Sequence, residues 1–164
     1  MRADSVNTFV IVLFIALIAY FTWQGSVGKK KANENSAIGN KFLENNKQQE
    51  GVLVTASGLQ MLKLQPGTGT EHAKPSDKVR VHYHGTLIDG SVFDSSVDRG
   101  EPIEFNLNQV IPGWTEGLQL MVEGEKSRLF IPSNLGYGNR KSGSIPGGSA
   151  LIFDVELLAI TTSN

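Results

Sequence analysis

Aromatic and aliphatic residues gather around the glycine-rich turns in the second half of the chain, and their types could form a binding pocket. The set consists of Tyr83, Phe93, Phe105, Val110, Ile111, Trp114, Tyr137, Ile145 and Phe153. Such residues can bind an apolar ligand or fill a core, and each one taken singly is more often a core residue. The residue types alone leave both interpretations open.

Standard catalytic motifs are absent from the sequence. It holds no nucleophile elbow, no phosphate-binding P-loop, no H-E-x-x-H and no cysteine. His82 and His84 would point the same way on a strand, but two ligands on a solvent-facing surface are too few for a metal site. We therefore expect no metal and no cofactor, and any enzyme here must work without a covalent nucleophile.

Length and charge exclude other classes. The chain has 164 residues, enough for one ordinary domain beside a distinct N-terminal segment. Fifteen basic and 16 acidic residues give a formal net charge of -1, so there is no basic field to attract nucleic acid.

Short segments with a period of two predict an antiparallel sheet. Between residues 79 and 87, Val79, Val81, Tyr83 and Leu87 alternate with polar side chains, as in a half-buried strand. Residues 103–107, 127–131 and 151–158 repeat the alternation, and residues 58–64 favour one more strand. No more than one short helix is expected among them.

That helix is expected to begin at Pro112, which suits a first helical turn. Trp114, Leu118 and Met121 recur at helical spacing, and Gly124 is expected to end the helix. One short helix within a curved antiparallel sheet defines an α+β fold.

The N-terminal segment is predicted to be a membrane anchor. Residues Phe9 to Trp23 are almost all apolar and end in aromatic residues typical of a bilayer interface. A cleaved signal peptide is the alternative. The basic residues 29–31 that follow would keep the rest of the chain in the cytoplasm by the positive-inside rule.

We divide the chain into residues 1–31 as anchor or signal segment, 32–54 as a polar stalk and 55–164 as the domain that contains the sheet. Within the stalk, residues 36–49 could form a short helix capped by Ser36 and facing a partner through a weak apolar stripe. A solvated stalk is the interpretation we favour.

Several motifs carry a family resemblance. VHYHGTLIDGSVFDSSVDRGEPIEF, VIPGWTEGLQLMVEGEKSRLFIP, GYG and IPGGSALIFDVELL follow one another between residues 55 and 160. In order and spacing they closely resemble the FKBP-type peptidyl-prolyl cis/trans isomerases. The resemblance implies an FKBP-like fold, an enzyme that acts on X-Pro bonds of protein clients, and a proline-binding pocket.

By that resemblance Trp114 would be the pocket floor, and Asp94 a buried carboxylate that pairs with Arg99. The catalytic positions it implies are Tyr83, Phe93, Asp94, Ile111, Trp114, Tyr137 and Phe153, and the substrate-binding positions are Arg99, Ile103, Phe105, Val110 and Ile145. Without the resemblance, Asp94 would be read as a turn residue, because F-D-S-S can form an Asx turn. Macrolide inhibitors are further ligands that the family implies, although the polar loop around Ser144 leaves their affinity open.

Residues 36–60 resemble the macrophage infectivity potentiator-like branch of the family, whose members work in the periplasm or at the cell surface. We therefore expect the domain to face the periplasm, against the lysine evidence. The long dimerising helix of that branch is expected to be absent, which leaves a dimer open. The alternative function is a membrane-tethered chaperone or peptide-binding module with little turnover.

Overall fold

The computed structural model describes the backbone of residues 3–162 and the side chains of residues 17, 18 and 20–162. Its elements, in chain order, are α1 (Ala3–Asn46), β1 (Val52–Val54), β2 (Gln60–Gln65), β3 (Lys78–Leu87), β4 (Val92–Ser95), α2 (Ser96–Arg99), β5 (Ile103–Asn106), the 3-10 turn η1 (Leu107–Gln109), α3 (Pro112–Gln119), β6 (Lys126–Ile131), the 3-10 turn η2 (Ser133–Leu135) and β7 (Leu151–Thr161).

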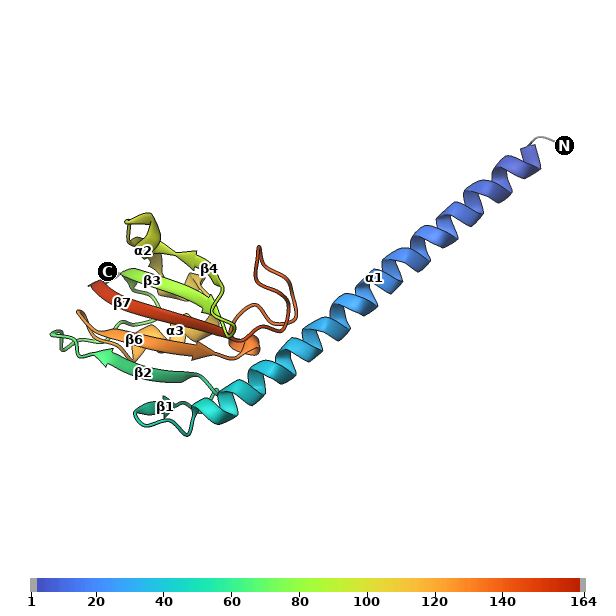
Figure 1. The fold of residues 1–164 in the computed structure, drawn as a ribbon. Helices are drawn as coiled ribbons and strands as arrows, with labels where there is room; N and C mark the ends of the chain where they lie inside the picture. Colours follow the sequence, from blue (N-terminus) through green and yellow to red (C-terminus); the bar gives the residue numbers. More distant parts are fainter. Residues whose placement is uncertain (1–2, 163–164) are drawn as a thin grey trace.

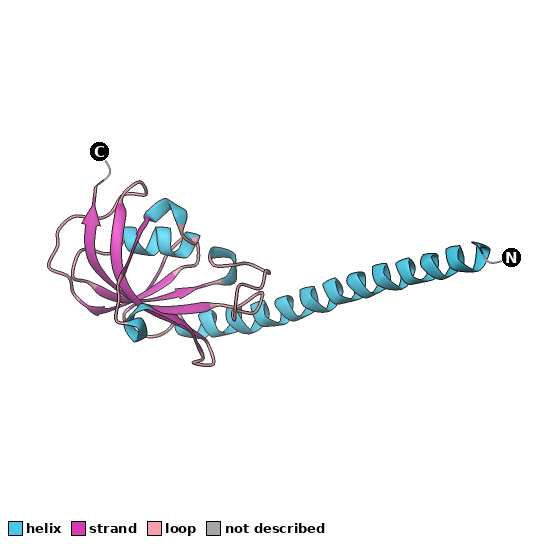
Figure 2. Ribbon diagram, turned by 90° about the horizontal axis from the view of Figure 1, so that it is seen from above, coloured by secondary structure: helices cyan, strands magenta, loops and turns pink. Residues whose placement is uncertain are grey.

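The strands form one curved antiparallel sheet in the order β1-β2-β6-β7-β3-β4. The free side of β3 is shared: β5 pairs with residues 78–81 and β4 with residues 84–86. The chain crosses from β4 to β5 through the short helix α2. Figure 2 shows the sheet bending around α3, so the predicted α+β architecture is confirmed.

Strand β3 has the alternation that the sequence predicts. Val79 and Val81 are fully buried and Tyr83 nearly so, whereas Arg80 is exposed. On the outer face, the ring Nδ1 atoms of His82 and His84 are each hydrogen-bonded to a serine hydroxyl at 2.9 Å. The outer face of β3 therefore carries a polar network.

Helix α3 lies close against β6 because two of its glycines face that strand. A Cβ atom at Gly113 would lie 2.6 Å from Ile131 Cγ2, and one at Gly117 would lie 2.9 Å from Leu129 Cδ1. Cβ atoms are essentially never found this close to a neighbour, so a larger residue at either position would force a shift. Glycine at both positions sets the height of α3 above the sheet, and with it the position of Trp114.

The predicted end of this helix at Gly124 is wrong. Helix α3 ends at Gln119, and the N–H of Leu120 already bonds back three residues to Gly117. Val122 forms a bridge with His72, and the N–H of Gly124 donates to the carbonyl of Leu157 in β7. Tertiary pairing therefore takes the chain out of the helix before the glycine is reached.

The N-terminal segment is one continuous helix, so two expectations were wrong: the solvated stalk and the absence of a long helix. The C-terminal part of α1 packs against the domain, where Ala32, Leu43 and Asn46 are buried. These buried residues lie in a segment that is otherwise polar. They are buried by contact with the sheet domain, which the composition of the segment does not record, so the composition alone predicts a solvated stalk.

Figure 1 shows the N-terminal part of α1 projecting away from the sheet. Its apolar side chains are exposed on several sides, with Phe21 60% and Trp23 64% accessible. Among the described residues, no helix has both the length and the apolar character needed to cross a membrane. The side chains of residues 9–16 and 19, within the apolar segment, lie outside the described residues.

Candidate active site

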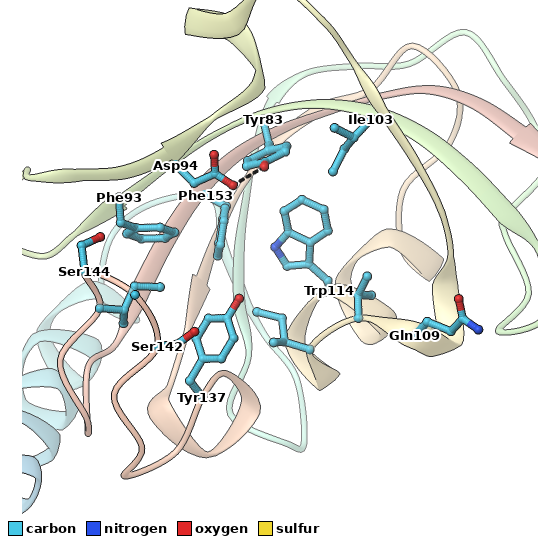
Figure 3. Close-up of a pocket in the computed structure, with 14 residues that line it drawn as sticks. Tyr83, Phe93, Asp94, Ile103, Gln109, Trp114, Tyr137, Ser142, Ser144 and Phe153 are labelled. Carbon is cyan, nitrogen blue, oxygen red and sulfur yellow. Dashed lines mark hydrogen bonds between the residues drawn. The ribbon is translucent and has the colours of Figure 1, made fainter.

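A cavity of about 480 Å³ opens at the end of the sheet above α3. Its wall comes from β3, β4, β5, β7, the start of α3 and the loop after η2. The lining residues are Tyr83, Phe93, Asp94, Ile103, Gln109, Val110, Ile111, Trp114, Tyr137, Ser142, Gly143, Ser144, Ile145 and Phe153. Figure 3 shows the labelled rings arranged around an open space.

Trp114 forms the base of this cavity. Its indole is held edge-on by two rings, with centroid distances of 5.1 Å to both Tyr83 and Phe153 and interplanar angles near perpendicular, 81° and 79°. Such edge-to-face contacts are the favoured geometry for aromatic pairs. Phe105 supports the indole from outside the cavity at 5.4 Å. The base is therefore rigid and apolar.

The indole N–H of Trp114 is the buried side-chain polar atom without a hydrogen-bond partner in the part of the chain that the structure describes. Trp114 itself is only 5% exposed. Its indole nonetheless lines the cavity and is not sealed beneath other side chains. An apolar ring can thus rest on it.

One polar cluster stands at the rim. The Tyr83 hydroxyl donates to Oδ2 of Asp94, and the Arg99 guanidinium binds Oδ1 of Asp94 and reaches the Tyr83 oxygen at 3.1 Å. Asp94 lies in strand β4, so the Asx-turn interpretation is wrong. Helix α2, capped by the Ser95 side chain, returns Arg99 to Asp94.

The expectation of a buried carboxylate is also wrong, because the Asp94 side chain is 43% exposed. Its position on β4, beside the edge of the sheet, leaves one side open to solvent. Burial by itself would raise the pKa of Asp94, but the hydrogen bonds from Tyr83 and Arg99 and the charge of Arg99 outweigh it and hold the pKa below its ordinary value.

The pKa of Tyr83 shifts in the opposite direction. Burial is the largest cause, and the hydrogen bond to Asp94 adds to it; together they raise the pKa above the ordinary value for tyrosine despite the opposing influence of Arg99. At neutral pH the cluster therefore holds a protonated Tyr83, an ionised Asp94 and a charged Arg99.

The loop of residues 137–148 covers one side of the cavity. Tyr137 is 41% exposed, and its hydroxyl points toward the open space, whereas Ile145 is buried and closes the wall. Ile111, at the N-terminus of α3, also lines the cavity. Within residues 20–162 no protein acceptor receives a hydrogen bond from its main-chain N–H.

The structure brings together ten of the twelve residues selected from the sequence. Phe105 and Arg99 do not line the cavity; the first supports Trp114 and the second holds Asp94 and Tyr83. The selection missed four lining residues, namely Gln109, Ser142, Gly143 and Ser144. Three of these belong to the polar loop whose composition was already noted, whereas nothing in the residue type of Gln109 indicated a site.

Comparison with known proteins agrees with this geometry. The family model described as FKBP-type peptidyl-prolyl cis-trans isomerase matches residues 69–158, which is more than half of the chain. A second model, the domain amino terminal to FKBP-type peptidyl-prolyl isomerase, matches residues 16–61 and therefore all of the described side chains of α1.

Individual relatives give the same result. The FKBP-type peptidyl-prolyl cis-trans isomerase FkpA of Aeromonas hydrophila is 57% identical over 131 residues, covering 80% of this chain and 48% of its own length. The outer membrane protein MIP of Legionella longbeachae is 48% identical, with 80% and 56% covered. The chain thus spans about half the length of these curated relatives.

Among solved structures, the crystal structure of FkpA from Escherichia coli superposes with a TM-score of 0.84 at 37% identity, covering all of this chain and 75% of that one. Its similarity includes α1 as well as the sheet domain. Fold, pocket and sequence agree: the chain belongs to the FKBP-type peptidyl-prolyl cis-trans isomerase family.

Proposed function

We propose that this protein catalyses cis/trans isomerisation of X-Pro bonds in protein clients and thereby assists their folding. The observation that carries the proposal is the apolar cavity with Trp114 at its base and the Tyr83–Asp94 pair at its rim. A proline ring is small, apolar and flat enough to rest on an indole.

The chemistry needs no nucleophile. Rotation about an amide C–N bond meets a barrier of about 18–20 kcal/mol, because the bond has partial double-bond character. Water strengthens that character by hydrogen bonding to the carbonyl oxygen of the planar amide. A pocket that removes the carbonyl from water and fits the twisted form better than the planar form lowers the barrier.

Two groups can fix the backbone of the client. The Ile111 N–H and the Tyr137 hydroxyl are donors on two residues that line the cavity, and each could bind a client carbonyl. In this scheme Asp94 is not a base. It orients Tyr83 and places negative charge beside the rotating carbonyl, while the rings of Phe93 and Phe153 exclude water.

The test is an NMR exchange measurement on an X-Pro peptide. We expect wild type to accelerate exchange and a Phe93→Ala, Asp94→Ala double variant to lose most of the acceleration. A Val97→Ala, Glu101→Ala double variant is the matched control, because it removes an apolar and an acidic side chain that are both exposed. Equal rates for wild type and the pocket variant would reject catalysis at this pocket and leave peptide binding without turnover.

For the cellular site, we propose a membrane-anchored protein at the cell envelope, with the domain in the periplasm. Supporting observations are the apolar run from Phe9 to Trp23, the exposed aromatic side chains at its end and a relative whose name is outer membrane protein MIP. The three lysines at residues 29–31 argue for the opposite orientation.

Membrane fractionation followed by carbonate washing tests the anchor, and a compartment-specific reporter fused after Asn164 tests the orientation. We expect the protein to stay with the membrane fraction and the periplasm-dependent reporter to be active. Release by carbonate, or activity of only a cytoplasm-dependent reporter, would overturn the corresponding half of this proposal.

A further inference from the structure

The loop that covers the cavity has a closed base and a narrow tip, and we call residues 137–148 the flap. At its base the N–H of Gly148 donates to the carbonyl of Gly138 at 2.8 Å. At its tip Ser142 and Ile145 exchange two backbone hydrogen bonds, at 3.0 and 2.8 Å. Five flap residues line the cavity, so the position of the flap determines the shape of the pocket.

Helix α1 touches the base of the flap from the side opposite the cavity. The Asn35 side-chain amide donates to the carbonyl of Gly147 at 2.8 Å. A Cβ atom at Gly148 would lie 1.9 Å from the carbonyl oxygen of Ala32, and one at Gly147 would lie 3.3 Å from Ala32 Cβ. The two backbones are therefore in direct contact, with Ala32 almost fully buried between them.

The same helix face continues along the segments that flank the flap. Ser36 lies 3.4 Å, hydroxyl to hydroxyl, from Ser133, and a Cβ at Gly39 would lie 3.0 Å from Ala150 Cβ. The helix thus touches the chain just before the flap, at its base and just after it. Three successive contacts on one rigid element fix the flap base relative to the sheet.

The outer part of the flap is not held in this way. A cleft of about 400 Å³ separates it from α1, with Lys31 on the helix side and Lys141 and Ser144 on the flap side. Ser144 also lines the main cavity, so the tip stands between two open spaces. Contact with the helix at the base and free space at the tip are the conditions for a hinged segment.

We propose that Ala32 and Asn35 of α1 are positioning residues for the pocket, which hold the flap so that Tyr137 and Ile145 face Trp114. This inference rests on the proposed function of that pocket. It makes α1 part of the isomerase unit, because the helix sets the affinity for the client without touching it. Neither residue reaches the reacting amide, so the effect acts through the flap.

The magnitude follows from the contacts. Losing one neutral hydrogen bond, such as that of Asn35, shifts the equilibrium constant between the closed and the open flap by roughly two- to twelvefold. The pocket floor and the Tyr83–Asp94 pair belong to the sheet and α3 and do not move. Client binding should therefore weaken, with a smaller effect on the rate of the bound client.

Two matched pairs in the full chain test the inference. Asn35→Ala removes the bond to the flap, and Asn33→Ala removes an exposed asparagine two residues away. Ala32→Leu forces bulk against the flap base, and Ala37→Leu adds the same bulk on an exposed position. KM and kcat come from NMR exchange, and backbone relaxation of residues 142–145 reports flap motion directly.

We expect Asn35→Ala and Ala32→Leu to raise KM about three- to tenfold with kcat changed less than twofold, and to increase motion at residues 142–145. Both controls should match wild type. Unchanged relaxation and unchanged KM in Asn35→Ala would overturn the inference, and so would equal effects in Asn33→Ala.

Flap relaxation needs no turnover, and it keeps this proposal separate from the previous one. If wild type does not accelerate exchange but Asn35→Ala increases flap motion, the proposed function is rejected and the positioning role of α1 is retained. If wild type accelerates exchange but Asn35→Ala leaves flap motion unchanged, the proposed function is retained and the positioning role of α1 is rejected. If Ala32→Leu alters the fold of the domain, the Asn35 and Asn33 pair still decides.

Discussion

The hydroxyl of Tyr83 donates to Asp94 across two adjacent strands, β3 and β4, and Arg99 binds both residues from the short helix α2 that follows. The pairing of Gly85 with Asp94 sets this register, so the backbone places the carboxylate beside the phenol. The pair combines a donor held in the pocket with a charge that remains half-exposed.

A double-mutant cycle measures this relationship. We expect Tyr83→Phe and Asp94→Ala each to lower kcat/KM about three- to tenfold, and the double variant to be little worse than either single variant, because both changes remove the same bond. The coupling free energy should be about 1 kcal/mol, reduced from that of a buried charged pair by the solvent around Asp94. Fully additive losses would show that the two residues act separately.

The opposite pKa shifts predict a broad pH profile. Asp94 has a pKa below its ordinary 3.8 and Tyr83 a pKa above its ordinary 10.0, so kcat/KM should stay constant between about pH 5 and pH 9. Asp94→Ala should lack any acid limb that wild type shows below this range. A titration near neutral pH in wild type would contradict this assignment of charges.

The same shifts fix the sign of the stability changes. The depressed pKa of Asp94 means that its contribution is complete above the unfolded value of 3.8 and is lost as pH falls through the folded value. The raised pKa of Tyr83 means that its contribution is complete below 10.0 and is lost as pH rises through the folded value. Urea unfolding at several pH values, in wild type and in each variant, checks both signs.

Gly85 keeps two pocket rings in place and offers a second test. A Cβ atom there would lie 2.7 Å from Phe93 and 2.8 Å from Phe153. Gly85→Ala should therefore displace both rings, destabilise the domain by about 1–3 kcal/mol and lower kcat/KM. Gly25→Ala is the control: nothing lies within 4 Å of its Cβ position in α1, and alanine should stabilise that exposed helix by about 0.5–1 kcal/mol.

Tryptophan fluorescence can report occupancy of the pocket. The chain has two tryptophans, of which Trp114 lines the cavity and Trp23 is 64% exposed on α1. In a Trp23→Phe variant all emission comes from Trp114, and we expect a proline peptide to shift and saturate it as water leaves the pocket. A Trp114→Phe variant that retains Trp23 should show no such change. A saturable change from Trp23 alone would place binding on α1.

Much of the sheet follows from local pattern. The period of two in β3 and β7 reflects one buried and one solvated face, which is a property that residue order records directly. The pocket is harder to predict, because residue type does not distinguish Phe105, which supports Trp114 from outside, from Phe153, which lines the cavity. The family motifs, not the residue types, singled out the pocket.

The misses have a common physical cause. Gly124 has the residue type of a helix end, yet Val122 is already paired with His72 before it is reached. Ala32 and Gly39 carry little apolar signal of their own, yet both are buried, because Gly147 and Gly148 of the flap approach Ala32 and Ala150 approaches Gly39. Such contacts depend on the whole fold, and no window of sequence around either residue contains them.

The junction between α1 and the sheet yields a final prediction about stability. Buried Asn46 donates to Oε1 of Gln60 at 2.8 Å, and the Gln60 amide donates to the carbonyl of Leu43 at 2.8 Å. Asn46→Leu keeps the number and branching of the side-chain heavy atoms but leaves the Gln60 oxygen without a donor, which costs about 1–3 kcal/mol. Asn45→Leu, one residue away and exposed, should change the free energy of unfolding by less than about 0.5 kcal/mol.

Combining Asn46→Leu with Gln60→Leu should recover part of the loss, because both partners are then apolar. The Leu43 carbonyl would keep its bond from the Lys47 N–H at 3.0 Å, so no buried acceptor is left unpaired. Urea unfolding of wild type and these three variants measures the differences at constant m-value. If Asn46→Leu unfolded at the same urea concentration as Asn45→Leu, the end of α1 would contribute nothing to the cooperative unit, and the helix could not hold the flap.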